Sequence, residues 1–353
     1  MISRAFFFVL FLSSAPALAG SFCVQTFNVY GPAYASNVGG RLERTAAELL
    51  QKPCEATQLQ ELWRDSDYSN FTRALESGRL AFVRADTLRS GDEALTGLAS
   101  GFAGQVLSSK SELFRVNNKG GFFDKIRDLT GVQKGFTLIE AKVDHGPLAL
   151  YANLHTHPDE PAIRMAQISQ LIDVLANAPS DLPFVLNGDL NATPDSLELA
   201  LLRDVLLLRD TFVEANGDYG KTCTYCAANP LSWSNEDRVI DFVLIRNSPS
   251  LELRSVRSEI TLTGGPRDPL SDHYGVRTEL EPVDRAAELL DPASEIVQAR
   301  LATAAATLKK AKRILAARSG AGFQEFAAKL DALESAMKSG NLPAGLQRVF
   351  LTP

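Results

Sequence analysis

Short apolar runs alternate with amphipathic stretches over the first 280 positions of the chain. The runs are rich in branched and aromatic side chains and end at glycine, proline or asparagine, which is typical of buried strands. They cover Phe22–Tyr30, Ala56–Leu62, Leu148–Leu154, Pro183–Leu186 and Val239–Ile245. The stretches with helical spacing cover Arg41–Gln51, Ala162–Leu175 and Leu197–Leu207. Strands interleaved with helices predict a layered α/β domain of about 260 residues.

The hydrophobic pattern changes its period after Pro282. Apolar residues then recur every three or four positions over 297–315 and again over 323–337, and the segment 319–322 separates the two as a turn. This spacing predicts a helical hairpin with a seam of the coiled-coil kind. We therefore expect a C-terminal helical hairpin extension over residues 284–353.

The N-terminal residues have the three parts of a secretory signal. Arg4 precedes an apolar run from Ala5 to Leu12, and Ala17-Leu18-Ala19 forms a cleavage site. The run is shorter than the roughly 20 residues that a membrane span needs. We expect residues 1–19 to be removed as a signal peptide, which leaves a secreted or periplasmic chain with no transmembrane segment.

Charge is distributed unevenly along the chain. The whole sequence has 36 Lys and Arg against 42 Asp and Glu, a formal net charge of −6. Removal of the signal peptide with Arg4 takes this charge to −7. Residues 284–353 hold ten Lys and Arg against seven Asp and Glu, a net of +3, so the α/β part carries about −10. This balance excludes a generally basic nucleic-acid binder.

The extension carries a basic stretch formed by Lys309, Lys310, Lys312, Arg313 and Arg318. Such a stretch predicts peripheral contact with an anionic phospholipid surface or an acidic partner. The alternative is a solvated face on a hairpin that packs against its own domain.

Four cysteines lie in the mature chain, where an oxidising compartment favours disulfides. Three pairings are possible, and the sequence alone does not decide between them. We favour Cys23 with Cys54, because each begins a strand-like run, and Cys223 with Cys226, because both lie in one loop. A four-thiolate zinc site is the weaker alternative, since the chain has only one C-x-x-C segment.

Acids, amides and histidines recur at the ends of successive predicted strands, where α/β sheets often place ligands. In chain order they are Asn28, Glu61, His155, Asp189, Asn191, Asp241, Asp272 and His273. Carboxylate and amide oxygens suit hard cations, Mg²⁺ above all, with Mn²⁺ or Ca²⁺ as alternatives. A hard metal ion and two histidines that move protons near neutral pH would together hydrolyse a phosphate ester.

This ordered series resembles the endonuclease/exonuclease/phosphatase superfamily over residues 22–281. The resemblance implies a DNase I-like four-layer α/β sandwich, in which two packed mixed β-sheets are flanked by helices. Residues 20–283 would then be the catalytic domain. By position, Glu61 would be the principal Mg²⁺ ligand, assisted by Asn28, and Asp272 would lie near the metal.

The same resemblance implies the catalytic roles. His273 would be the general base, oriented by Asp241, and Asp189 would position the attacking water. Asn191 would hold the phosphate, and His155 would be the general acid or an electrophilic stabiliser. His157, two positions further along, is the weaker histidine candidate.

Looser features are similar to the neutral sphingomyelinase branch of the superfamily. They lie in the segments 28–30, 61–68, 122–124 and 133–136 and at Arg41. They imply a sphingomyelinase-like phosphodiesterase with a phospholipid substrate, although the segment after His155 lacks the glutamine usual in bacterial members. A glycan at the Asn191 sequon would block the site, so we expect a bacterial host.

Three alternatives to a phospholipid substrate stay open. A secreted DNase I-like endonuclease would need a local basic patch for phosphates, for which the candidates are Lys119, Lys125, Arg127 and Lys134. A phosphatase would act on inositol or sugar phosphates. A protein of another class would be a catalytically weak module that binds a membrane or a partner.

Overall fold

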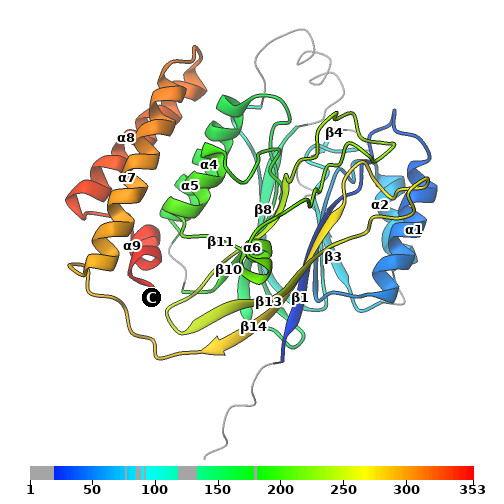
Figure 1. Cartoon of the computed structure of the whole chain (residues 1–353), viewed down its shortest axis with the longest axis horizontal. Coiled ribbons are helices and arrows are strands. Elements are labelled where there is room, and N and C mark those ends of the chain that lie inside the picture. Colours follow the sequence, from blue (N-terminus) through cyan, green and yellow to red (C-terminus); the bar gives the residue numbers. More distant parts are fainter. Residues whose placement is uncertain (1–19, 76–77, 85–88, 91–92, 118–132, 179–180) are drawn as a thin grey trace, which may run out of the picture.

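A computed structural model of the chain describes residues 20–353, except 76–77, 85–88, 91–92, 118–132 and 179–180 (Figure 1). The predicted signal peptide, residues 1–19, lies outside the described residues. The same is true of the segment 122–124 and of three of the four candidate basic residues, Lys119, Lys125 and Arg127.

Two six-stranded mixed sheets form the centre of the structure. The first has the order β13-β14-β1-β2-β6-β3. Its strands are β1 (Phe22–Asn28), β2 (Ala56–Gln60), β3 (Ala81–Arg84), β6 (Ala99–Phe102), β13 (Leu251–Thr261) and β14 (Gly275–Asp284). Strands β1 and β2 are parallel, with Val24 opposite Ala56, and the other neighbours are antiparallel.

The second sheet has the order β11-β12-β10-β9-β8-β7. Its strands are β7 (Gly104–Leu113), β8 (Gly135–Val143), β9 (Leu148–His155), β10 (Phe184–Asp189), β11 (Arg209–Asp210) and β12 (Asp241–Arg246). Here β9 and β10 are the parallel pair, and Asp189 is the register partner of His155. A separate ribbon pairs β4 (Arg89–Ser90) with β5 (Glu93–Ala94).

The two sheets pack face to face, with helices on both outer faces (Figure 1). Apolar residues of both sheets, among them Phe22, Tyr151 and Leu280, fill the space between them. Helices α1 (Val38–Gln51) and α2 (Asp65–Ala74) cover the first sheet. Helices α4 (Pro161–Ala176) and α5 (Leu197–Val205) cover the second, and the short α6 (Thr211–Asn216) contacts β13 and β12. The predicted four-layer sandwich is confirmed.

Several elements end where the backbone turns into the left-handed region. The run predicted over Phe22–Tyr30 ends as a strand at Asn28, because Tyr30 has φ 50° and its N–H bonds the Asn28 side chain at 3.0 Å. Helix α5 ends at Val205, shortly before Leu207 with φ 51°. A positive φ in a residue with a side chain is strained and is held by surrounding contacts.

The predicted helical hairpin is present as α7 (Glu295–Ala316) and α8 (Ala321–Ser339), and it is followed by α9 (Ala344–Leu351), which the pattern did not predict. The apolar seam of α7 joins the same buried cluster as α4 and α5. The hairpin thus forms a further layer outside these helices (Figure 1). The division of the chain into a catalytic domain over residues 20–283 and an extension over residues 284–353 stays a prediction.

The basic stretch of the extension is partly neutralised by carboxylates of the protein itself. Lys312 lies 2.5 Å from Asp331 and 2.7 Å from Glu334. Arg318 lies 2.7 Å from Glu160, whereas Lys309, Lys310 and Arg313 are exposed. Within the described part of the chain, no helix combines the length and the apolar character needed to cross a membrane.

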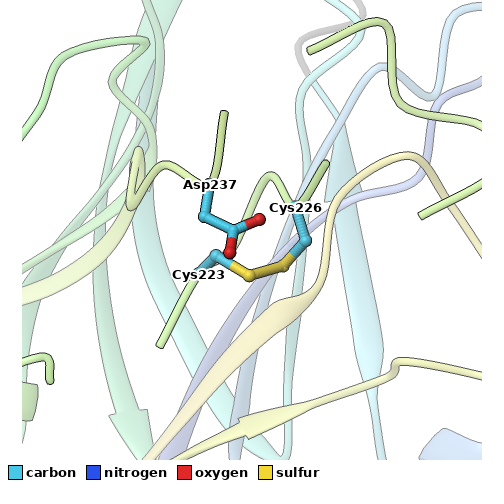
Figure 2. Close-up of side chains that lie close together, drawn as sticks. All are labelled: Cys223, Cys226 and Asp237. Carbon is cyan, nitrogen blue, oxygen red and sulfur yellow. A yellow bond between two sulfur atoms is a disulfide. The ribbon is translucent and has the colours of Figure 1, made fainter. Parts of the chain in front are cut away.

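Both favoured cysteine pairings are present as disulfides. Cys23 is bonded to Cys54 and Cys223 to Cys226, with Cα–Cα distances of 4.7 and 5.4 Å. The carboxylate of Asp237 lies beside the second disulfide (Figure 2). Because all four sulfurs are oxidised, the thiolates that a zinc site requires are absent.

The contact between α7 and the sandwich predicts a stability effect. Leu308 is completely buried in the shared cluster, so Leu308→Ala should lower the free energy of unfolding by about 2–5 kcal/mol. The control is Ile314→Ala, because this side chain on the same helix is 38% exposed. Urea unfolding of the full chain measures both, and equal small changes would mean that the extension is not part of the core.

Candidate active site

The carboxyl ends of the parallel pairs β1–β2 and β9–β10 meet at one edge of the sandwich. Asn28 ends β1 and Asp189 ends β10, and the Asn28 amide donates a hydrogen bond of 3.0 Å to Asp189 Oδ2. Glu61 follows β2, and His155 ends β9. The structure therefore brings side chains from both sheets into one cluster.

A cavity of about 670 Å³ opens at this edge. Six of the eight predicted site residues line it: Glu61, His155, Asp189, Asn191, Asp272 and His273. The other two, Asn28 and Asp241, are buried and hydrogen-bond residues of the cavity wall. His157 does not line the cavity; its Nδ1 accepts the backbone N–H groups of Asp159 and Glu160, each at 3.2 Å.

His273 and Asp241 form a hydrogen-bonded pair, with Nδ1 of the ring 2.9 Å from Oδ2 of the carboxylate. Burial alone would lower the pKa of His273, but the carboxylates of Asp241, Asp189 and Asp272 raise it well above its usual value. Burial also raises the pKa of Asp241. A histidine oriented through Nδ1 by a buried acid, with Nε2 left for the cavity, is the usual geometry of a general base.

Asp189 is the centre of the cluster. Its Oδ2 lies 3.3 Å from His155 Nε2 and 3.7 Å from His273 Nε2, and its Oδ1 accepts the backbone N–H of Asn191 at 2.9 Å. Burial opposes ionisation, but His273 and His155 hold the pKa of Asp189 well below its usual value. Asp189 is therefore a permanent negative charge in the site.

The end of β10 depends on a glycine, and the turn after it depends on an asparagine. Gly188 has φ 152°, and a Cβ there would lie 2.0 Å from the carbonyl oxygen of Leu154, so no other residue fits. Asn191 has φ 47° and donates its side-chain N–H to the Thr156 carbonyl at 3.1 Å. These contacts fix Asp189 and Asn191 relative to each other.

Lys134 is a further site residue, which the sequence indicated only as part of a basic patch and of the sphingomyelinase-like segment 133–136. Its Nζ lies 2.7 Å from His155 Nε2 and 3.9 Å from Glu61 Oε1. Burial lowers the pKa of His155, and the Lys134 ammonium lowers it further. The signal in the sequence was the lysine directly before Gly135, which is the register partner of His155 across β8 and β9.

The predicted metal ligands supply oxygen atoms on one side of the cavity. Glu61 has φ 63°, and a Cβ on Gly31 would lie 2.3 Å from its carbonyl oxygen, so the chain after β1 packs directly on the chain after β2. Burial, together with the charge of Glu61, raises the pKa of Asp272 to about 7, although His273 opposes this. Neighbouring carboxylates that repel each other fit a hard divalent cation, which would offset their charge.

Asn28 is engaged with protein atoms at both ends of its amide, since its Oδ1 accepts the Tyr30 N–H while its nitrogen bonds Asp189. Its observed contacts position Asp189, and its role at the metal stays a prediction. Among the described residues around the cavity, Asp189, Asp241 and His273 form a group with metal-ligand spacing. In that group His273 Nδ1 is already hydrogen-bonded to Asp241, so Glu61 and Asp272 are the better candidate ligands.

The sandwich and its polar cleft define the class of protein to which this chain belongs. The sequence model of the Endonuclease/Exonuclease/phosphatase family matches residues 26–273. The chain is a member of this family, whose members are generally hydrolases of phosphate ester bonds and usually use a divalent metal ion.

Solved structures with the same fold have low sequence identity to this chain. An endonuclease/exonuclease/phosphatase from Bacteroides vulgatus is 16% identical, with a TM-score of 0.57 over 74% of this chain and 99% of that chain. Sphingomyelinase C from Streptomyces griseocarneus is 16% identical, with a TM-score of 0.54 over the same shares. D. rerio TDP2 complexed with single strand DNA product is 14% identical, with a TM-score of 0.58 over 74% and 99%. The comparison with curated proteins gives no match.

The contact between Lys134 and His155 predicts a shift in a titration. Replacement of Lys134 by methionine keeps the length of the side chain and removes its charge, so the pKa of His155 should rise. The pKa should rise because a neighbouring cation disfavours the protonated ring, and the replacement removes that cation. NMR titration of the metal-free protein measures this pKa, with Arg115→Met, a partly exposed cation elsewhere, as the control. An unchanged His155 pKa in Lys134→Met would contradict the placement of Lys134.

Proposed function

We propose that this protein is an exported, Mg²⁺-dependent phosphodiesterase that hydrolyses a choline-containing phospholipid, as a sphingomyelinase does. The observation that carries the hydrolytic part is the convergence of Glu61, Asp189 and His273 at one cavity. The signal-like N-terminus and the two disulfides support export, because disulfides persist in oxidising compartments.

The chain's own residues would divide the work of hydrolysis. A Mg²⁺ ion held by Glu61 and Asp272 would offset the negative charge of the phosphoryl oxygens. His273 would take a proton from the attacking water at Nε2, because the positive charge of the metal would offset the carboxylates that raise the pKa of its ring. Asp241 would keep that ring oriented through Nδ1. Asp189, placed 3.7 Å from that Nε2, would position the water.

Lys134 and His155, which lie beside Glu61, would stabilise the leaving oxygen and the phosphate. Because burial and Lys134 lower the pKa of His155, its ring is neutral near pH 7, which favours a hydrogen-bonding role over that of a general acid. Lys134 would supply the positive charge there, beside His155. Asn191 would hold a phosphate oxygen from the turn after β10.

The charges that line the cavity favour the binding of a cationic lipid headgroup over the binding of a nucleic acid. Four carboxylates line it, those of Glu61, Asp159, Asp189 and Asp272, whereas Lys134 and Arg238 are the cationic side chains among its described lining residues. Nucleic-acid binding depends on a basic track for phosphates, which this lining does not provide.

Aromatic side chains add to this argument. Tyr30, Tyr34, Tyr225 and Trp233 also line the cavity, and Tyr34 and Trp233 are 80% and 82% exposed. Aromatic faces attract quaternary ammonium groups such as choline. We therefore infer that these rings receive the choline group while the phosphate lies against the metal and His273.

Parallel assays on sphingomyelin vesicles and on supercoiled plasmid DNA test the proposal. With Mg²⁺, the protein should release phosphocholine and leave the plasmid intact, and EDTA should abolish the reaction. His273→Ala should lower kcat by about 10²–10⁴, whereas His145→Asn, at an exposed turn, should leave it unchanged. Nicking of DNA without phosphocholine release would replace the lipid by the nuclease function, and turnover that survives EDTA would contradict the mechanism.

A further inference from the structure

The loop between α6 and β12 lies against both members of the His273–Asp241 pair. Residues 217–240 contain neither helix nor strand, apart from an isolated bridge between Tyr225 and Arg238. The Cys223–Cys226 disulfide closes a four-residue ring within this loop (Figure 2). The two residues inside the ring, Thr224 and Tyr225, are those that contact the pair.

Thr224 holds the start of β12, where Asp241 is located. Its hydroxyl oxygen accepts the backbone N–H of Ile240 at 3.0 Å and that of Asp241 at 3.2 Å. Its carbonyl oxygen accepts the N–H of Tyr274 at 2.7 Å, directly after His273. Thr224 is completely buried, so these bonds are shielded from water.

Tyr225 and the turn after the disulfide hold the His273 side of the pair. The Tyr225 ring lies 4.8 Å from the His273 ring, centroid to centroid. After the disulfide ring, the Cys226 carbonyl accepts the N–H of Asn229 at 3.0 Å. The Asn229 side chain in turn donates a hydrogen bond of 2.9 Å to the Ser271 carbonyl. The loop therefore contacts the segment 271–274 at three places.

Through these contacts the loop bridges the two sheets, since β12 lies in the second sheet and β14, which begins at Gly275, in the first. Asp241 and His273 thus depend on a connection across the sandwich for their relative position. We propose that the Cys223–Cys226 disulfide is a positioning element of the catalytic centre, which fixes Thr224 and Tyr225 so that Asp241 stays aligned with His273. This proposal rests on the proposed hydrolytic function. It adds that full activity requires Cys223 and Cys226 to be oxidised to the disulfide.

The Cys223–Cys226 disulfide closes a short ring, so its effect on the catalytic centre can be distinguished from an effect on the stability of the whole fold. A disulfide stabilises a fold chiefly through the length of the loop it closes in the unfolded chain. Cys223 and Cys226 are three positions apart, whereas Cys23 and Cys54 are 31 apart. The short ring therefore constrains little beyond its own residues, and its main effect falls on Thr224 and Tyr225.

Serine replacements at the two disulfides test the proposal with opposite expectations. Cys223→Ser/Cys226→Ser should lower kcat on bis-p-nitrophenyl phosphate by about 10-fold to 100-fold, because small misplacements at a catalytic centre have effects of this size. KM should stay unchanged. The control, Cys23→Ser/Cys54→Ser, should lower Tm more but keep the kcat of the folded protein.

Thr224 provides an independent route to the same effect. Thr224→Val removes the acceptor of the Ile240 and Asp241 N–H groups and should lower kcat, whereas Thr224→Ser keeps this acceptor and should retain activity. Combined with the Cys223/Cys226 double variant, Thr224→Val should cause no further loss, because both changes act through one contact. Additive losses would contradict this shared mechanism.

A measurement without substrate keeps this proposal separate from the proposed function. The His273 ring protons experience the ring current of Tyr225, so their NMR signals should move in the Cys223/Cys226 double variant even if no phosphodiester is cleaved. Unmoved His273 signals, or an unchanged kcat in that variant, would overturn the positioning role. Inactivity of the wild-type protein on every phosphodiester together with moved signals would reject the proposed function and keep the positioning role.

Discussion

A carboxylate buried between two β-sheets is stable only when its surroundings supply hydrogen bonds and positive charge. Asp189 meets this condition through Asn28 from the first sheet and through His155, His273 and the Asn191 N–H around it. These contacts fix the ends of β1, β9 and β10 relative to one another. The positions of the other site residues follow from this arrangement. Glu61 and Asn191 lie just beyond strands that end at this edge, whereas Asp241 and His273 lie at or just before the start of antiparallel strands.

Three of the residues with a strained backbone lie at the same edge. Tyr30, Glu61 and Asn191 all have positive φ values, and all three line the cavity. Such conformations persist only where surrounding contacts impose them, and they are concentrated at functional sites. Here the contacts are the close approach of Gly31 to Glu61 and the hydrogen bonds that Asn28 and Asp189 make to the following turns. The contacts that hold the cluster together therefore also hold these three residues in strained conformations.

The alternation of strands and helices predicted a layered α/β domain, and the family resemblance implied the sandwich. Six of the eight predicted site residues line the cavity because the chemistry follows strand ends. Asn28, Glu61, His155 and Asp189 each end an apolar run, and parallel strands bring such ends together. The antiparallel register that places Lys134 beside His155 is a long-range pairing, so the sequence showed the lysine before Gly135 but not its contact with His155. Exposed strands such as β7, whose side chains are mostly polar, also lack an apolar signal. The spacing of apolar residues predicted the seam of α7, but it predicted neither the surface on which the seam packs nor the helix α9.

Anomalous scattering from Mn²⁺ in crystals of the full chain would show which residues hold the metal. We predict one ion bound to carboxylate oxygens of both Glu61 and Asp272 at about 2.0–2.3 Å, in the cavity that His273 and Asp189 line. An ion held by Asp189, Asp241 and His273 instead, with Glu61 and Asp272 both uncoordinated, would contradict this assignment.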